Sequence, residues 1–251
     1  MQKKDIYLEQ TYRVRSYECG PDGYVQLTQV CNYLQETAST HADILGLSKE
    51  TLSAYNLTWV LARLRVKLER YPKWRDDVKV LTFPHSMRKL TAQRDFILTL
   101  SDDTPIGIAT SEWMGLDLAT RRAARLPKVF SNCNNTVRTP VWSQNPFTKP
   151  TYPDEGIGER QIDFRVQYSH IDLNGHVNNV RYIEWIMETA SGATSSEKVA
   201  EIEIAFKAEA FVGETVTSRS SELSEQTFAH CVSTPSQDLV LAVSKWKEFA
   251  D

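Results

Sequence analysis

Several features that would settle the class of this protein at once are missing from its sequence. No stretch approaches the roughly 18 consecutive apolar residues that cross a bilayer, so no membrane span is predicted. The formal net charge of the 251 residues is only −3. The chain therefore lacks the dominant basic surface that general nucleic-acid binding needs. It also has no glycine-rich phosphate loop. A globular protein of one or two domains remains, with no nucleic acid as partner.

Metal and disulfide chemistry have little support as well. The four cysteines lie far apart and form no Cys-x-x-Cys pair: Cys19, Cys31, Cys133 and Cys231. Free thiols in a reducing compartment are the simplest interpretation. The histidines lack ligand spacing with cysteines or carboxylates: His41, His85, His170, His176 and His230. We therefore predict no metal and no other cofactor.

The first fourteen residues, MQKKDIYLEQTYRV, contain no apolar core. They predict neither a secretory signal nor a typical transit peptide. Together with the expected free thiols, this favours a cytoplasmic location.

The chain repeats itself. Residues 31–39 align with residues 183–191, and both segments end in Glu-Thr-Ala-Ser. Two further matches follow in the same order, 65–71 with 205–211 and 110–113 with 243–246. Repetition of this kind predicts two domains with one architecture.

Each half shows the same predicted plan of elements. Helices are expected near 25–38 and 177–190, and the second is apolar around most of its circumference, which is typical of an enclosed helix. Segments 64–68 and 202–206 alternate apolar and charged residues, as strands of antiparallel sheets with one wet face do. The segment 131–158 has no period and predicts a linker. The predicted fold class is α+β, with a long helix wrapped by an antiparallel sheet, made twice.

Residues able to do chemistry gather where a strand turns into the second helix. Asp172, Asn174 and His176 alternate over five residues, and Asn174-Gly175 is a turn signal. His176 is expected at or just before the first helical turn, beside unpaired backbone N–H groups and the positive end of the helix dipole. Fixed dipoles there could stabilise the oxyanion that develops during acyl transfer. However, Asp and Asn are also ordinary cap and turn residues. The residues by themselves leave both roles open.

The segment Asp-x-Asn-x-His-Val-Asn-Asn-x-x-Tyr-x-x-Trp, from Asp172 to Trp185, resembles the active-site signature of acyl-acyl carrier protein (acyl-ACP) thioesterases. This family is known from plant plastids and from bacteria. Residues 69–74, Glu-Arg-Tyr-Pro-Lys-Trp, and the Thr-Arg-Arg and Leu-Pro pieces of 120–127 resemble further family segments. The resemblance covers nearly the whole chain. It implies a tandem double hot-dog fold.

Under this resemblance, residues 1–130 form a degenerate domain that accommodates the acyl chain. Residues 131–158 are the linker and residues 159–251 the catalytic domain. The implied activity is hydrolysis of the fatty acyl-ACP thioester in fatty acid biosynthesis, which releases free fatty acid and holo-ACP. The implied partner is acyl carrier protein bearing a phosphopantetheine-linked fatty acyl chain.

The resemblance also implies the catalytic residues. Asp172, Asn174 and His176 match the signature directly, and Glu209 matches the glutamate of a family strand that reads roughly Tyr-Arg-Arg-Glu-Cys. Ala210 stands where plant members have cysteine, so a papain-type cysteine–histidine mechanism is not available there. A carboxylate could activate water or attack the thioester itself. The sequence does not separate these two routes.

The alternation of side chains along a strand argues against a catalytic role for Glu209. The residue falls in phase with Glu203 and Lys207 and opposite to Ile204 and Phe206. A solvated strand residue is the plain interpretation. A catalytic Glu209 needs that face of the strand to border the site, or a bulge that re-aims the side chain.

The first half of the chain does not contain the Asp-x-Asn-x-His pattern of the second half. Internal alignment places Gly20, Asp22 and Tyr24 opposite the three residues of the second-half loop. By family resemblance the first half shapes an acyl pocket, with Trp59 as a candidate wall, although ordinary core packing explains such a residue equally well.

A local basic cluster stands out in this nearly neutral chain: Arg121, Arg122 and Arg125. It could steer the docking of an acidic carrier protein. A solvated face is the alternative interpretation of such a charge run.

Three alternatives to the implied activity stay open. The first is a thioesterase acting on acyl-coenzyme A. The second is a non-catalytic acyl-binding protein, against which the joint presence of the four catalytic candidates argues. A hot-dog dehydratase fits less well, because the Asp-x-Asn-x-His pattern is not that family's arrangement. A homodimer is compatible with the sequence, and the preferred acyl chain cannot be read from it.

Overall fold

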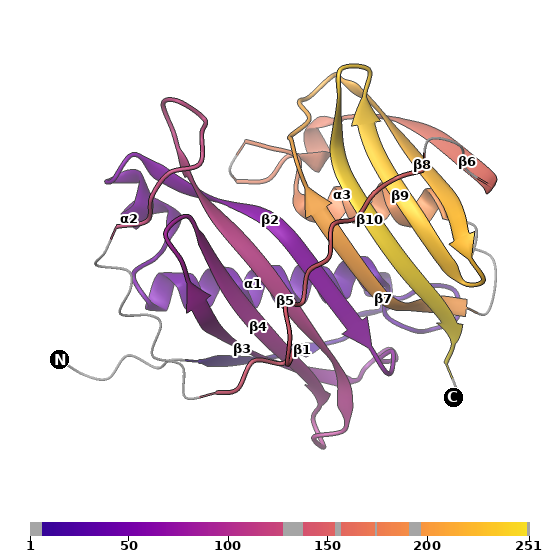
Figure 1. Cartoon of the computed structure of the whole chain (residues 1–251). Helices are drawn as coiled ribbons and strands as arrows, with labels where there is room; N and C mark the ends of the chain where they lie inside the picture. Colours follow the sequence, from indigo (N-terminus) through magenta and orange to yellow (C-terminus); the bar gives the residue numbers. More distant parts are fainter. Residues whose placement is uncertain (1–6, 128–137, 154–156, 174, 191–196, 250–251) are drawn as a thin grey trace. The chain divides into compact units, whose positions relative to one another are not determined.

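The computed structural model describes residues 7–127, 138–153, 157–173, 175–190 and 197–249. The chain divides into two compact units, each a helix with an antiparallel sheet (Figure 1). The first unit comprises Met1–Leu64 and Glu69–Pro146, and the second comprises Arg65–Leu68 and Phe147–Asp251.

In its described residues, the first unit contains one long helix, one short helix and one 3₁₀ turn. Its helical elements are η1 (Ser16–Glu18), α1 (Leu27–Ile44) and α2 (Lys49–Ser53). Its strands are β1 (Leu8–Arg13), β2 (Leu57–Leu68), β3 (Asp77–Met87), β4 (Thr91–Leu100) and β5 (Pro105–Asp117), although the last four residues of β2, Arg65–Leu68, group with the second unit. They lie in the order β1-β3-β4-β5-β2, and α1 packs against β1 and β3.

The second unit repeats this plan with shorter connections. Its helical elements are η3 (Tyr168–His170) and α3 (Asn179–Thr189). Its strands are β6 (Ile157–Arg165), β7 (Glu197–Phe206), β8 (Thr215–Ser224), β9 (Thr227–Thr234) and β10 (Gln237–Glu248). They lie in the order β7-β10-β9-β8-β6, and α3 packs against β6, β8 and β9.

Both long helices lie where the sequence predicted them, although α1 runs six residues further than expected, to Ile44. In α3 the side chains of Ile183 and Ile186 are fully buried, and Trp185 is 3% exposed. Burial of side chains around most of the helix confirms that α3 is enclosed. The apolar core of each unit therefore lies between its helix and its sheet, and these contacts fix where the first turn of the helix stands.

Backbone hydrogen bonds confirm the internal repeat in the loop before each helix. The N–H of Gly20 donates to Tyr24 O, and the N–H of Asp172 donates to His176 O, both at 2.9 Å. The glycine before Tyr24 has φ +79°, and Gly175 has φ +78°. The two loops follow one backbone path, so Tyr24 and His176 occupy equivalent positions.

The repeat continues through the helices and into the last strands. A threonine hydroxyl donates to the carbonyl one turn earlier in each helix, from Thr37 to Tyr33 O at 2.8 Å and from Thr189 to Trp185 O at 2.7 Å. An indole N–H donates to a serine hydroxyl in β5 and β10 alike, from Trp113 to Ser111 and from Trp246 to Ser244. Two of the three predicted alignments are therefore confirmed.

The remaining alignment was wrong by two residues. After β2 and after β7, two successive N–H groups donate to one carbonyl oxygen of the neighbouring strand. The donors are Glu69 and Arg70 to Ile106 O, and Lys207 and Ala208 to Leu239 O. Glu69 is therefore equivalent to Lys207, and the residue equivalent to Glu209 is Tyr71. The alignment of the two sequences pairs Glu69 with Glu209 because both are glutamates. The backbone hydrogen bonds instead pair Glu209 with Tyr71.

Part of the predicted linker is tied to the sheets. The N–H of Val141 donates to Asp95 Oδ2 at 2.9 Å in the first unit. The N–H of Thr148 donates to Glu203 Oε1 at 2.6 Å in the second. Residues 131–137 and 154–156 lie outside the described residues, and β6 begins at Ile157. The domain ranges drawn from the sequence stay a prediction.

Three of the four cysteines, Cys19, Cys31 and Cys231, are free thiols, as predicted, and Cys133 lies outside the described residues. Within the described ranges, no helix combines the length and apolar character needed to cross a membrane.

Candidate functional site

The loop between η3 and α3 is closed on itself by backbone bonds. Ile171 and Val177 form an isolated antiparallel bridge. The N–H of Gly175 donates to Asp172 O at 3.0 Å, with Gly175 in the left-handed region that glycine adopts at least cost. Asp172 and His176 thus stand at the two ends of a tight turn. Asn174, the third predicted residue of this loop, lies outside the described residues.

His176 precedes the first turn of α3, as predicted. The side chain of Asn178 caps this helix, with its Oδ1 accepting the N–H of Val180 at 2.8 Å. That amide is therefore already used. The positive end of the helix dipole still faces the region next to His176, where it favours negative charge.

Glu209 reaches this loop because it lies beyond the strand. β7 ends at Phe206, and the N–H groups of Lys207 and Ala208 share the carbonyl of Leu239 at 2.8 and 3.2 Å. Two donors on one acceptor make a bulge, after which strand parity no longer sets the direction of a side chain. The alternation of side chains along β7 therefore does not argue against a catalytic role for Glu209.

The structure brings His176 and Glu209 together. His176 Nδ1 lies 3.1 Å from Glu209 Oε2, which is within ion-pair distance, although the approach lacks hydrogen-bond geometry. The two side chains are 27% and 32% exposed. An acid and an imidazole therefore meet at a partly open position beside the positive end of α3. Catalytic contacts are often loose without substrate and tighten when it binds.

Two aromatic residues flank this pair, and sequence reasoning gave neither of them a role. The ring of Phe211 lies 6.4 Å from the ring of His176, and Phe211 is 54% exposed. Tyr182 is 2% exposed, and its hydroxyl oxygen accepts the N–H of Ala210 at 2.9 Å. The signature contained Tyr182, but nothing in the sequence indicated what its hydroxyl contacts.

A second histidine near the loop has a different environment. His170 Nδ1 accepts the N–H of Gln167 at 3.2 Å, and its ring meets Trp185 edge-on at 5.6 Å. Burial, and secondarily the charge of Arg181, lower the pKa of His170. These contacts describe a neutral, structural imidazole that helps to seat η3 on α3.

The described part of the chain contains no group of three or more His, Cys, Asp or Glu side chains placed to hold a metal ion.

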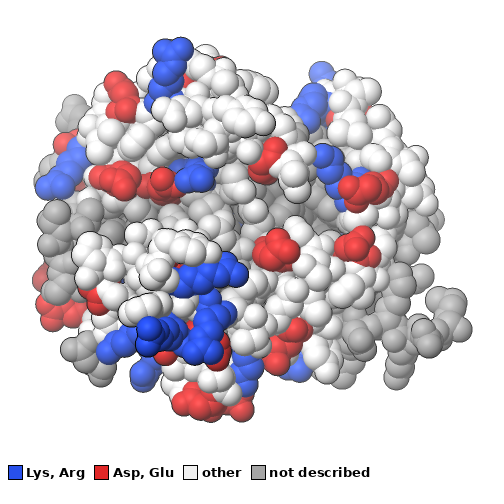
Figure 2. All heavy atoms as spheres, turned by 180° about the vertical axis from the view of Figure 1, so that it is seen from behind, with Lys and Arg blue, Asp and Glu red and all other residues white. Residues whose placement is uncertain are grey.

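The three arginines of the basic cluster are exposed in the loop that follows β5. This loop is held beside the turn between β3 and β4, because the N–H of Leu126 donates to Lys89 O at 2.9 Å. A Cβ at Gly115 would lie 2.7 Å from Leu126 Cδ2, so the leucine side chain would have to move aside. The contact adds Arg88 and Lys89, both exposed, to the cluster. Figure 2 shows that Lys and Arg also gather locally on one face of a protein whose net charge is only −3.

Trp59 is part of a small hydrophobic cluster. It packs against Leu47, Leu52 and Leu57, and its indole N–H donates to Leu47 O at 3.1 Å. Core packing accounts for these contacts, and a role in an acyl pocket stays a prediction.

Comparison with known proteins covers both units. Residues 5–132 match the family described as the acyl-ACP thioesterase N-terminal domain. Residues 157–248 match the acyl-ACP thioesterase C-terminal domain.

Among curated relatives, a chloroplastic palmitoyl-acyl carrier protein thioesterase of Gossypium hirsutum is 33% identical over 201 residues, which are 74% of this chain and 47% of that protein. A chloroplastic oleoyl-acyl carrier protein thioesterase of Coriandrum sativum is 29% identical over 195 residues, 72% of this chain and 53% of that protein. The chain thus spans about half the length of the curated relatives it matches.

Solved structures agree over almost the whole chain. An acyl-ACP thioesterase from Bacteroides thetaiotaomicron has a TM-score of 0.86 at 24% identity, covering 98% of this chain and 100% of that one. The 12:0-ACP thioesterase from Umbellularia californica has a TM-score of 0.87 at 23% identity, covering 96% and 97%. These likenesses confirm the predicted α+β, tandem double hot-dog fold. With both halves matched by its domain families, the chain belongs to the acyl-ACP thioesterase family.

Proposed function

We propose that this protein hydrolyses the thioester bond of fatty acyl-ACP in fatty acid biosynthesis, releasing free fatty acid and holo-ACP. The observation that carries the proposal is the His176–Glu209 pair beside the positive end of α3. Family membership supplies the substrate class, since the relatives are named for palmitoyl- and oleoyl-acyl carrier protein. A cytoplasmic location fits the free thiols.

The geometry favours Glu209 as the base. Its carboxylate takes a proton from water while the water oxygen bonds to the thioester carbon, and the carbon–sulfur bond then breaks. The phosphopantetheine thiolate leaves and takes up the proton. His176 holds the carboxylate in position, and the positive end of α3 stabilises the oxyanion formed at the carbonyl. Asp172 and Asn174 belong to the same proposed site, with Asp172 as the second candidate for the base.

Acyl-ACP thioesters of several chain lengths test this function directly. We expect release of fatty acid with a higher kcat/KM on acyl-ACP than on the acyl-coenzyme A of the same chain. A preference for acyl-coenzyme A would support the first alternative. Saturable acyl binding without turnover would support the non-catalytic one. Size-exclusion chromatography with light scattering on the same preparation reports whether a homodimer forms.

We propose that the basic cluster docks the acidic carrier protein. Replacing Arg121, Arg122 and Arg125 together by alanine is expected to raise KM for acyl-ACP about tenfold at low salt, which corresponds to about 1.4 kcal/mol of binding. The loss should shrink as salt rises, because the Debye length falls from about 10 Å at 0.1 M to about 3 Å at 1 M. The measurement is KM for acyl-ACP at both salt concentrations.

Acyl-pantetheine, a small carrier without the protein, is the control substrate, and its KM should not change. Arg13→Ala, which removes an exposed arginine paired with Asp77, is the control variant. An equal rise in KM on acyl-pantetheine, or an effect that salt does not alter, would rule out docking through this cluster.

A further inference from the structure

A hydrogen bond links helix α3 to the peptide that follows Glu209. The hydroxyl oxygen of Tyr182 accepts the N–H of Ala210 at 2.9 Å, and Tyr182 is 2% exposed. That N–H belongs to the peptide group joining Glu209 to Ala210. The helix that presents His176 at its start therefore also holds the backbone that carries Glu209.

The rest of this segment is anchored elsewhere. Lys207 and Ala208 donate to Leu239 O before the glutamate. After it, the N–H of Phe211 donates to Glu214 Oε2 at 2.8 Å, and the N–H of Gly213 donates to Val166 O at 3.0 Å. These bonds fix the two ends of the segment. The bond from Tyr182 acts between them, next to Glu209 itself.

The first unit follows the same path. There the N–H of Lys73 donates to Asp76 Oδ2 at 2.7 Å, and the N–H of Arg75 donates to Val14 O at 3.1 Å. These bonds correspond to those of Phe211 and Gly213, so the residue equivalent to Ala210 is Pro72. Proline has no N–H to donate.

The partner of this bond is missing from the first unit too. Thr37 in α1 corresponds to Thr189 in α3, because each hydroxyl donates to the carbonyl one turn earlier. Counting back the same distance in both helices makes Val30 the equivalent of Tyr182. The side chain of valine has no hydrogen-bonding group. The half without the candidate site therefore builds the same segment with neither donor nor acceptor, so the fold does not require this bond.

We infer that Tyr182 is a positioning residue for the proposed hydrolysis, its hydroxyl holding the Glu209–Ala210 peptide so that the carboxylate stays within reach of His176. The inference rests on the proposed function and adds a residue to it. Burial raises the pKa of Tyr182 to about 12, so the hydroxyl keeps its proton near neutral pH.

Tyr182→Phe is the first test, because it removes one oxygen atom and leaves the ring in place. We expect kcat to fall roughly 10- to 100-fold, since small displacements of a catalytic group cost about that much. KM should stay within about twofold, because the bond contacts neither the acyl chain nor the carrier. Tyr33→Phe is the matched control, since this buried hydroxyl donates to Glu18 in the first unit. It should leave kcat unchanged even if the thermal midpoint falls.

Ala210→Pro, alone and combined with Tyr182→Phe, completes the test. The first unit shows that this backbone path accepts proline. Without the N–H the hydroxyl has nothing to hold, so the double variant should have the kcat of Ala210→Pro alone. Independent losses that multiply would overturn the inference. A normal kcat in Tyr182→Phe beside an inactive Glu209→Gln would also overturn it while leaving the proposed function intact. An inactive wild-type protein would overturn both.

Discussion

Replacing Glu209 by glutamine is expected to lower kcat on acyl-ACP by roughly 10²–10⁴, the usual contribution of a general base. Glutamine keeps nearly the shape of the side chain but cannot take a proton from water. KM should change little, because the change affects the transition state and not the binding of the acyl chain. Steady-state kinetics on one acyl-ACP, with circular dichroism to confirm folding, measure both quantities.

His176→Ala and Asp172→Asn accompany this variant and separate the roles. His176→Ala should lose a similar factor, roughly 10²–10⁴, and combining it with Glu209→Gln should add little, because groups that act as a unit are not additive. Glu188→Gln, an exposed change in the last turn of α3, is the control and should be neutral. A folded His176→Ala protein with near-normal turnover would remove His176 from the site. Full activity in Glu209→Gln and its loss in Asp172→Asn would make Asp172 the base.

The helices and the loop were predictable because their signals are local. An enclosed apolar stretch specifies α3 without reference to the rest of the chain. The positive φ of Gly175 and the cap at Asn178 depend on neighbouring residues only. His176 could therefore be placed at the start of the helix from sequence alone.

The position of Glu209 could not be derived in this way. Its direction depends on two N–H groups sharing the carbonyl of Leu239, which lies on another strand. Strand parity assumes a regular ladder and carries no information about such a bulge. Family resemblance selected Glu209, and the structure supplies the physical reason why it can contact His176.

Contacts between segments far apart in the chain could not be predicted from the sequence either. No pattern relates the hydroxyl of Tyr182 to the amide of Ala210, because neither residue type implies the other. The misplaced alignment of Glu69 with Glu209 has a similar origin. A matching side chain is visible in sequence, whereas the backbone path that makes Tyr71 the equivalent of Glu209 appears only once the bonds to Ile106 and Leu239 are known.

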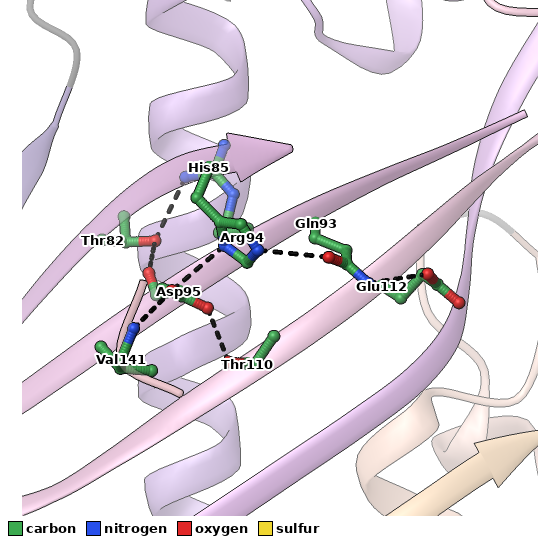
Figure 3. Close-up of polar contacts among 8 residues, drawn as sticks. All are labelled: Thr82, His85, Gln93, Arg94, Asp95, Thr110, Glu112 and Val141. Carbon is green, nitrogen blue, oxygen red and sulfur yellow. Dashed lines mark hydrogen bonds and ion pairs between the residues drawn. The ribbon is translucent and has the colours of Figure 1, made fainter. Parts of the chain in front are cut away.

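A buried carboxylate in the first sheet is expected to contribute to stability. Asp95 in β4 is fully buried, on the face of the first sheet opposite to that of Arg94, which contacts His41 of α1 at 2.8 Å. Its carboxylate accepts the Thr110 hydroxyl at 2.6 Å and the N–H of Val141 at 2.9 Å (Figure 3). The linker segment is therefore bonded directly to the sheet.

The network extends from Asp95 toward the surface. His85 Nδ1 lies 3.1 Å from Asp95 Oδ2, and His85 Nε2 lies 3.2 Å from Gln93 Oε1. The amide of Gln93 donates to Glu112 at 3.0 Å. The side-chain oxygen of Gln93 thus faces the imidazole, and its amide nitrogen faces Glu112. One buried carboxylate thus organises two strands, a histidine and the linker.

Asp95→Ala is expected to destabilise the first unit by about 2–6 kcal/mol, because each of the two donors to this buried carboxylate that is left without an acceptor costs about 1–3 kcal/mol. The change leaves the Thr110 hydroxyl and the Val141 N–H without their acceptor, and His85 without its charged neighbour. Asp95→Asn should cost less, about 1–3 kcal/mol, because one acceptor oxygen remains. Urea unfolding followed by circular dichroism measures both values.

The substitution should also loosen the linker segment near Val141. Arg138, three residues before Val141, packs over the rings of Tyr7 and Phe83, so trypsin should cleave after it sooner in Asp95→Ala than in the wild-type protein. Glu112→Gln, at the outer end of the network, is the control and should change stability by less than about 0.5 kcal/mol. If Asp95→Ala unfolds at the same urea midpoint as the wild-type protein, the linker is held without this carboxylate. Hydrolysis by the folded fraction should be unaffected, because none of these residues belongs to the proposed catalytic group in the second unit.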